Sequence, residues 1–268
     1  MVKKGKGKRK IKTETKILIV ALIVLFIINY PFFDNLLKNF LDESQPAFVE
    51  RVIDGDTIDI GNSTVRLLGI NTPERGEIYY SEAKEFLERE ISNKNVTLGF
   101  SKERYDRYDR ILAYVFFGNR NINLELIENG FANYYFPSGK DRYYDEFADA
   151  WRNCINNNVN LCEASTNSCA SCVELKKLDA KNDKIVLYNG CSFQCDLTDW
   201  IIKDEGRKKF VFPRFLLNNG GEVSIVNGSK TDTSSLLYWR NESYILTETG
   251  DTIFLRDSFG KLVLWKSY

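Results

Sequence analysis

Val52-Ile53-Asp54-Gly55-Asp56-Thr57 is the stretch that predicts most about this chain. Its β-branched residues predict a strand, and its Asp-Gly step predicts a tight turn that places two carboxylates close together. A second strand begins at Val65, contains the single charge Arg66, and ends in the polar loop Asn71-Thr72-Pro73-Glu74. Carboxylates that can hold a hard cation, beside a guanidinium and a spare Glu, suit the cleavage of a phosphodiester.

Length and composition limit the classes of protein that fit. The chain has 268 residues, enough for two domains with separate cores, and it contains no histidine. The lack of histidine excludes Ser-His-Asp and Cys-His hydrolysis and any zinc site that uses histidine. The first 16 residues contain eight Lys/Arg and one Glu, so the rest of this neutral chain has a net charge of about −7. Binding of nucleic acid should therefore depend on a metal ion and a few arginines rather than on a broad basic face.

The N-terminal part predicts a membrane anchor. Residues 1–16 form a basic tail, and the seventeen residues 17–33 contain no charge. Seventeen helical residues would span about 26 Å, close to the roughly 30 Å hydrocarbon core of a bilayer. We expect an uncleaved transmembrane helix, with a cytoplasmic N-terminus and an extracytoplasmic catalytic part. Secretion after cleavage of a signal peptide is the alternative. Residues 34–46 would then be a tether.

Residues 47–162 predict an OB-fold, a five-stranded β-barrel with helices in an α+β domain. A helix should begin with Ser81 as its N-cap, and a short second helix should end before Gly130. The strands are expected at residues 48–53, 57–60, 64–68, 96–100 and 111–117. The buried helical residues are expected to be Ala83, Phe86, Leu87 and Ile91 in the first helix, and Phe147, Trp151, Cys154 and Ile155 in a third.

Three motifs follow one another along this domain. They are Ile-Asp-Gly-Asp-Thr from Ile53, Arg-Leu-Leu-Gly-Ile-Asn-Thr-Pro-Glu from Arg66, and Tyr-Asp-Arg-Ile-Leu-Ala-Tyr from Tyr108. In this order and spacing they resemble the staphylococcal nuclease-like (thermonuclease) family over roughly residues 47–162. The resemblance implies a Ca²⁺-dependent endonuclease, a phosphodiesterase in which water attacks in line at phosphorus and the 5′ P–O bond breaks.

The resemblance also implies a set of metal ligands. Asp56, the side chain of Asn71 and the backbone carbonyl of Thr72 would bind Ca²⁺, and hard oxygen ligands suit this ion. Asp54 would orient the loop behind them; the alternative is that Asp54-Gly55-Asp56 is only a turn. The best-known members of the family carry Asp where this chain has Asn71. Because the site loses one negative charge, weaker calcium binding is expected.

Arg66, Glu74 and Arg110 are the expected catalytic residues. Arg66 is a lone charge in an apolar strand and needs a partner, which is either the scissile phosphate or a structural salt bridge. On the phosphate, its guanidinium would favour the charge of the pentacovalent state. Arg110 would be a second clamp near the leaving oxygen. By resemblance Glu74 is the general base that activates or orients a metal-associated water, and a structural carboxylate at a helix start is the alternative.

Aromatic side chains near these residues are candidates for substrate contact. Tyr108, Tyr134 and Tyr135 suit stacking on bases or contact with phosphate, although the last two suit core packing equally well. Arg107 is expected to contact the phosphate backbone or to remain solvated. Single-stranded DNA or RNA is favoured as substrate, because a barrel cleft admits a splayed strand more readily than a stiff duplex.

The C-terminal part predicts a second domain. Residues 163–171 form a Cys-rich linker, and residues 172–268 predict an immunoglobulin-like β-sandwich. Seven strands are expected, at residues 173–178, 184–188, 200–204, 209–212, 222–226, 252–256 and 262–265. Ile-Val-Leu-Tyr-Asn, Asp-Leu-Thr-Asp-Trp-Ile-Ile-Lys-Asp and Gly-Asp-Thr-Ile-Phe-Leu-Arg-Asp resemble the lamin tail domain. Such a domain would hold substrate, envelope or another partner.

All six cysteines lie between Cys154 and Cys195. An even number of cysteines in an extracytoplasmic protein favours disulfides. We expect Cys154 to pair with Cys162 and the other four to pair among themselves. The spacing of those four also fits a four-thiolate zinc site, so both interpretations stay open.

Together these features predict a membrane-anchored, extracytoplasmic, calcium-dependent nuclease for DNA or RNA. A binding module without catalysis is one alternative, favoured by Asn71 and by the acidic balance. A surface adhesion protein that acts through its C-terminal sandwich is another. The presence of Asp56, Arg66, Glu74 and Arg110 in one chain favours the enzyme.

Overall fold

The computed structural model describes residues 24–25, 29–30, 44–137, 139–248 and 250–268. By its internal contacts the chain divides into residues 1–44 and 45–268, and the second unit contains both predicted domains. The expected transmembrane helix and tether lie almost wholly outside the described residues. Among the residues that are described, no helix is both long and apolar enough to cross a membrane.

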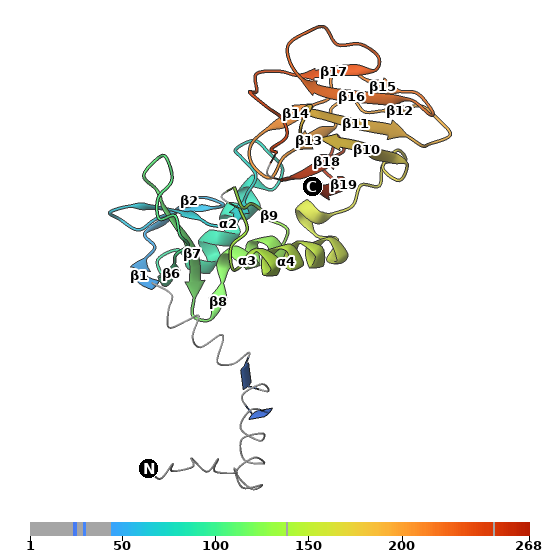
Figure 1. The fold of residues 1–268 in the computed structure, drawn as a ribbon. Helices are drawn as coiled ribbons and strands as arrows, with labels where there is room; N and C mark the ends of the chain where they lie inside the picture. The colour runs from blue at the N-terminus through green and yellow to red at the C-terminus, as the bar shows by residue number, and fades with distance from the viewer. Residues whose placement is uncertain (1–23, 26–28, 31–43, 138, 249) are drawn as a thin grey trace, which may run out of the picture. The chain divides into compact units, whose positions relative to one another are not determined.

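The first domain has an OB-fold-like sheet with the strand order β1-β6-β7-β4-β3-β2, and β8 lies beside β7 (Figure 1). β2, β3 and β4 form the expected antiparallel meander, whereas β4 and β7 are parallel, with Val65 opposite Ile111. β5 pairs with β9 outside this sheet. The strands are β1 (Ser44–Phe48), β2 (Arg51–Asp54), β3 (Thr57–Asp59), β4 (Thr64–Leu67), β5 (Ile70–Asn71), β6 (Asn95–Gly99), β7 (Ile111–Phe117), β8 (Arg120–Asn121) and β9 (Asn133–Tyr134). All five expected strands are present, and β5, β8 and β9, at two residues each, are too short to leave a periodic pattern.

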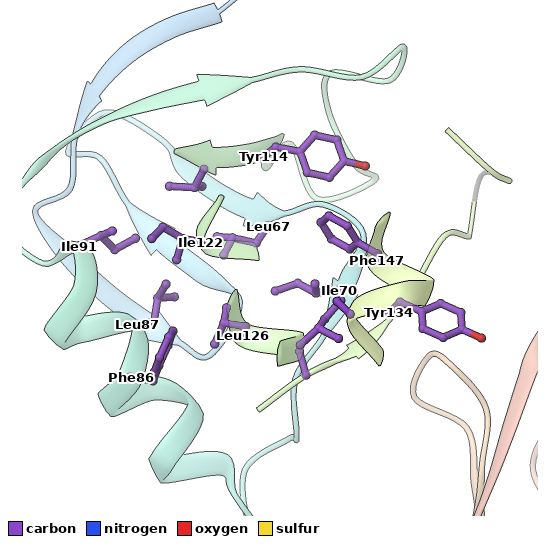
Figure 2. Close-up of a cluster of buried hydrophobic side chains, with 14 of the residues drawn as sticks. Leu67, Ile70, Phe86, Leu87, Ile91, Tyr114, Ile122, Leu126, Tyr134 and Phe147 are labelled. Atoms are coloured by element: carbon purple, nitrogen blue, oxygen red, sulfur yellow. The ribbon is translucent and has the colours of Figure 1, made fainter. Parts of the chain in front are cut away.

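Three helices complete this domain: α2 (Tyr80–Ile91), α3 (Ile122–Glu128) and α4 (Tyr144–Asn157). The predicted apolar faces of α2 and α4 are correct, except that Ile155 is only partly buried. The predicted N-cap is wrong, because Tyr79 holds that position in a left-handed conformation and Ser81 already lies inside α2. Figure 2 shows how side chains from the helices and strands gather in one cluster, among them Leu67, Ile70, Phe86, Leu87, Ile91, Ile122, Leu126 and Phe147.

The second domain has two four-stranded sheets and a short two-stranded one (Figure 1). Its core contains the buried side chains Trp200, Phe212, Ile225 and Leu255. The first sheet has the order β10 (Val173–Asp179), β11 (Lys184–Asn189), β16 (Glu222–Asn227), β17 (Leu236–Trp239); the second has the order β14 (Lys209–Val211), β13 (Ile201–Lys203), β18 (Thr252–Arg256), β19 (Leu262–Ser267). β12 (Cys195–Asp196) pairs with β15 (Leu216–Leu217). The seven expected strands are confirmed, and β12, β15 and β17 are additional.

The two domains share part of a core. Trp151 on α4 packs against Phe254, with ring centroids 5.3 Å apart, and against Trp265 at 6.3 Å. The Tyr134 hydroxyl is 2.8 Å from the hydroxyl oxygens of both Thr252 and Ser267. Figure 2 shows this hydroxyl pointing away from the apolar cluster. The second domain is therefore packed on the first by buried side chains.

The linker is also part of the fold. The backbone N–H of Ser165 donates to the Leu262 carbonyl of β19 at 2.8 Å, and the Leu262 N–H donates to Glu163 at 2.8 Å. The six cysteines form three disulfides, Cys154–Cys162, Cys169–Cys195 and Cys172–Cys191. The expected local pair is confirmed, and the other four cysteines pair among themselves across the linker and the sandwich.

Candidate active site

The turn between β2 and β3 places Asp56 beside the loop that follows β5. Asp54 accepts a hydrogen bond from the Asp56 backbone N–H at 3.2 Å, which is the orienting role expected for it. Burial raises the pKa of Asp54, and the neighbouring charge of Asp56 raises it further. Gly55 is required by space, because a Cβ at this position would lie 2.8 Å from the Thr72 hydroxyl and 2.9 Å from Ala83. The Asp-Gly-Asp sequence therefore serves close packing as well as the turn.

The expected metal ligands and one expected catalytic arginine meet in a buried cluster. One carboxylate oxygen of Asp56 accepts from the Thr72 backbone N–H at 3.1 Å and from its hydroxyl at 3.0 Å. The same oxygen is 3.0 Å from Nη2 of Arg66, and this nitrogen also donates to Oδ1 of Asn71 at 3.2 Å. All four residues are less than a tenth exposed. Arg66 thus has the buried partner that its apolar strand requires.

The donor set of this cluster suits a hard cation. Oxygens of Asp56 and Asn71 both lie within hydrogen-bond distance of one guanidinium nitrogen, so this is a place where positive charge is stabilised. Carboxylate and amide oxygens are ligands that Ca²⁺ and Mg²⁺ prefer. These two residues would hold the ion. The Thr72 carbonyl, next to them in the chain, remains a predicted ligand.

Glu74 and Asn71 also contact the second domain. Nδ2 of Asn71 donates to the Gly206 carbonyl at 2.8 Å, and Glu74 forms an ion pair with Nε of Arg207 at 2.8 Å. Glu77, in the same loop, binds Lys203 at 2.8 Å and Lys209 at 3.1 Å. Although burial opposes it, the charge of Lys203 lowers the pKa of Glu77 to about 2. Sequence reasoning missed this part of the site, because its residues lie 126 to 135 positions from their partners along the chain.

Arg110 directly precedes β7, the strand that pairs with the β4 strand of Arg66. Its Nε and Nη2 are both 2.7 Å from one carboxylate oxygen of Asp106. The other oxygen of Asp106 accepts the backbone N–H groups of Tyr108 and Arg110, and against the effect of burial these bonds lower the Asp106 pKa. In the part of the chain that the structure describes, no hydrogen bond or ion pair joins Arg110 to Asp56 or Arg66. The role of second clamp stays a prediction.

The three candidate tyrosines have different surroundings. Tyr108 is 59% exposed, and its ring lies 4.8 Å from the Arg107 guanidinium carbon and 5.5 Å from that of Arg110. This aromatic and basic loop is accessible to a nucleic acid. Tyr134 is buried and bonded to the second domain, so it is a packing residue. Burial raises the pKa of the half-buried Tyr135, which keeps its hydroxyl protonated near neutral pH.

Comparison with known proteins identifies both domains. The model of the staphylococcal nuclease homologue family matches residues 64–163, and that of the lamin tail domain matches residues 166–268. The thermonuclease of Staphylococcus intermedius is 32% identical over 167 residues, which is 58% of this chain and 99% of that protein. The thermonuclease of Staphylococcus hyicus is 35% identical over 156 residues, 53% of this chain and 91% of that protein. An uncharacterized endonuclease of Haemophilus influenzae is 32% identical over 134 residues, 48% of this chain and 70% of that protein.

The chain therefore belongs to the staphylococcal nuclease family and carries a lamin tail domain after its nuclease domain. It is a nuclease, as the sequence motifs predict.

Proposed function

We propose that this chain is a membrane-anchored, extracytoplasmic, calcium-dependent endonuclease that cleaves DNA or RNA and favours single strands. The observation that carries the proposal is the convergence of Asp56, Asn71 and Arg66, with N···O distances of 3.0 and 3.2 Å, beside the loop that ends in Glu74. A calcium ion held there would polarise the phosphate. Arg66, beside the ion, would donate to the phosphate oxygens in the pentacovalent state.

Glu74 is the proposed general base. Its side chain is about half exposed, so water can reach it, and it forms an ion pair with Arg207 at 2.8 Å. Tyr108 and Arg107 would contact the strand outside the scissile bond, because their exposed loop joins an aromatic face to positive charge.

The test is cleavage of plasmid and of single-stranded oligonucleotides in calcium and in a chelator. Glu74→Gln should lower turnover by about 10²- to 10⁴-fold, the usual contribution of a general base. Its calcium affinity should stay within about twofold of wild type, since Glu74 is not a proposed ligand. Glu85→Gln, an exposed carboxamide variant on α2, should cleave like wild type. Binding of oligonucleotide without cleavage would favour a binding module instead.

The proposed location rests on the basic residues 1–16, the uncharged residues 17–33 and the three disulfides, which form in oxidising compartments. Full-length protein should stay with membranes after alkaline carbonate extraction, and added protease should reach its catalytic part on intact cells. Recovery of a shortened chain from the medium would favour secretion.

A further inference from the structure

The hairpin of β13 and β14 in the second domain reaches the candidate nuclease site. Its turn, residues 204–208, offers two backbone carbonyls to the first domain: Glu205 accepts from Nδ2 of Asn133 at 3.1 Å, and Gly206 accepts from Nδ2 of Asn71 at 2.8 Å. On either side of the turn, Lys203 and Lys209 bind Glu77. Five residues of one hairpin thus contact β5, the loop after β5, or β9, when the Arg207 pair with Glu74 is included.

Asn71 is 2% exposed, and its amide has two unlike ends. The nitrogen can only donate, and the oxygen can only accept. Because the Gly206 carbonyl accepts, it binds the nitrogen and turns Oδ1 toward Nη2 of Arg66, the nitrogen that also contacts Asp56. In the opposite orientation, the nitrogen would face the Arg66 guanidinium and oxygen would face oxygen at Gly206. Both contacts would be repulsive in a buried site.

We propose that the second domain positions a metal ligand of the first: the Gly206 carbonyl selects the orientation of Asn71 that presents its oxygen to the cation. This inference rests on the proposed calcium site. It also accounts for asparagine at this position, because an ionised aspartate would place an oxygen without a proton against the Gly206 carbonyl. The side-chain amide of Asn71 therefore suits the docked hairpin, and the second domain is part of the proposed active site.

Calcium affinity then depends on the docked hairpin. An undocked hairpin would leave Asn71 free to adopt other rotamers, and the apparent dissociation constant rises as the competent fraction falls. A competent fraction of about a fifth to a half corresponds to a two- to fivefold loss of affinity. A carboxylate has two equal oxygens and gains no orientation from Gly206, so opening the hairpin should not weaken calcium binding by an aspartate here.

The experiment is a double-mutant cycle on calcium binding, measured by calorimetry on the full chain without substrate. The double substitution Lys203→Glu/Lys209→Glu replaces two attractions to Glu77 by repulsions. It is introduced into two backgrounds, the natural chain and the Asn71→Asp variant. The added negative charge acts on calcium equally in both, so it cancels in the comparison. The dissociation constant should rise two- to fivefold more in the natural chain than in Asn71→Asp.

Lys181→Glu/Lys230→Glu is the matched control. It makes the same charge change in the second domain, at two exposed lysines outside the hairpin of β13 and β14. This pair should give the same change in both backgrounds. Amide hydrogen exchange of residues 204–208 reports whether the hairpin has opened; if it stays protected, Asn133→Leu is added to remove a further anchor.

An equal change in both backgrounds, with the hairpin open, would overturn the proposal. Cleavage is assayed in parallel so that two failures can be told apart. A chain that cleaves in calcium but shows equal changes would retain the nuclease function and lose the positioning role of Gly206. A chain that shows the unequal changes but does not cleave would retain the positioning role and lose the proposed function.

Discussion

Arg66 would combine, under the proposed function, two roles that the sequence leaves as alternatives. Its ion pair with Asp56 and its bond to the Leu67 carbonyl, at 2.7 Å, satisfy a charge that is 8% exposed. The same guanidinium borders the oxygens that would hold calcium. In the proposed mechanism the same side chain would be a structural partner before the reaction and a phosphate ligand during it.

Because Arg66 would serve both the fold and the reaction, its replacement should reduce both stability and cleavage. Arg66→Met leaves the buried Asp56 carboxylate without its partner, and breaking such a pair costs about 3–5 kcal/mol of unfolding free energy. We expect cleavage to be lost and the unfolding midpoint in urea to fall. Calcium should restore part of the stability, since the ion binds only the folded chain.

The control for this prediction is Arg110→Met. Its pair with Asp106 is partly exposed, with 23% of the Arg110 side chain accessible, so we expect a loss of only about 1 kcal/mol. Equal destabilisation by the two substitutions, or no rescue of Arg66→Met by calcium, would contradict the roles assigned to Arg66.

Residues close in sequence were predictable as a site, and distant ones were not. Asp54, Asp56, Arg66, Asn71 and Thr72 lie on adjacent strands and short loops, so local pattern brings them together. Their contacts with the second domain left no signal, because a backbone carbonyl such as that of Gly206 can come from any residue type. The same applies to Arg207, whose partner Glu74 follows only from tertiary structure.

At the scale of the element, strands with a long apolar or alternating pattern were predictable and two-residue strands were not. β7 was predicted with its bounds, because seven residues from Ile111 to Phe117 form a continuous apolar run. β5 and β9 escaped prediction, yet their pairing places Asn71 opposite Asn133. The N-cap of α2 was mispredicted because the prediction looks for a side chain that hydrogen-bonds to the first turn of the helix. Tyr79 holds the N-cap position in a left-handed conformation and makes no such bond.

The hairpin turn makes stability depend on pH. Burial raises the pKa of Asp204 from 3.8 to about 6 and that of Glu205 from 4.5 to about 7, and the charge of Asp251 adds to both. Because the folded values lie above the unfolded ones, this contribution to stability is complete below about pH 4 and is lost as pH rises through 6 to 7. The loss is at most roughly 3 kcal/mol per carboxyl, at 1.4 kcal/mol per pKa unit.

Calorimetry between pH 4.5 and 7.5 tests this dependence. Asp204→Asn/Glu205→Gln should raise the midpoint at pH 7.5 more than at pH 4.5. Asp179→Asn is the comparison, because hydrogen bonds from Lys177 and Asn182 lower the pKa of this carboxyl to about 2, outside the tested range. An equal shift of the double variant at both pH values would show that these carboxyls do not titrate there.

At the scale of the whole molecule, the cysteines hold the linker in place. Cys169–Cys195 joins it to the sandwich, Cys172–Cys191 lies within the second domain next to it, and Cys154–Cys162 closes the end of α4. Thiol titration of the denatured, unreduced protein should find no free thiol, and a metal assay should find no zinc. Replacing the Cys169–Cys195 pair by alanine should cost about 2–4 kcal/mol. Four titratable thiols with one zinc per chain would instead support the thiolate site.

The shared core predicts that the two domains unfold together. Phe254 of the second domain lies in the core cluster of the first, where it packs on Trp151. Phe210 lies wholly within the sandwich core, against Phe212 and Trp239. Phe210→Ala should cost about 3 kcal/mol. Calcium binding reports on unfolding of the nuclease domain, and fluorescence reports on unfolding of the sandwich. If the two domains unfold together, Phe210→Ala must lower the urea midpoint of both signals by the same amount.

Phe254→Ala separates coupling from stability. It removes the ring that joins the two cores, so the calcium-binding and fluorescence transitions should split, and the nuclease domain should unfold first because it loses a buried contact of Trp151. If Phe210→Ala left the unfolding midpoint of the nuclease domain unchanged, the two domains would fold independently. The hairpin contacts at Asn71 and Glu74 would then form without support from a common core, and calcium affinity would no longer depend on sandwich stability.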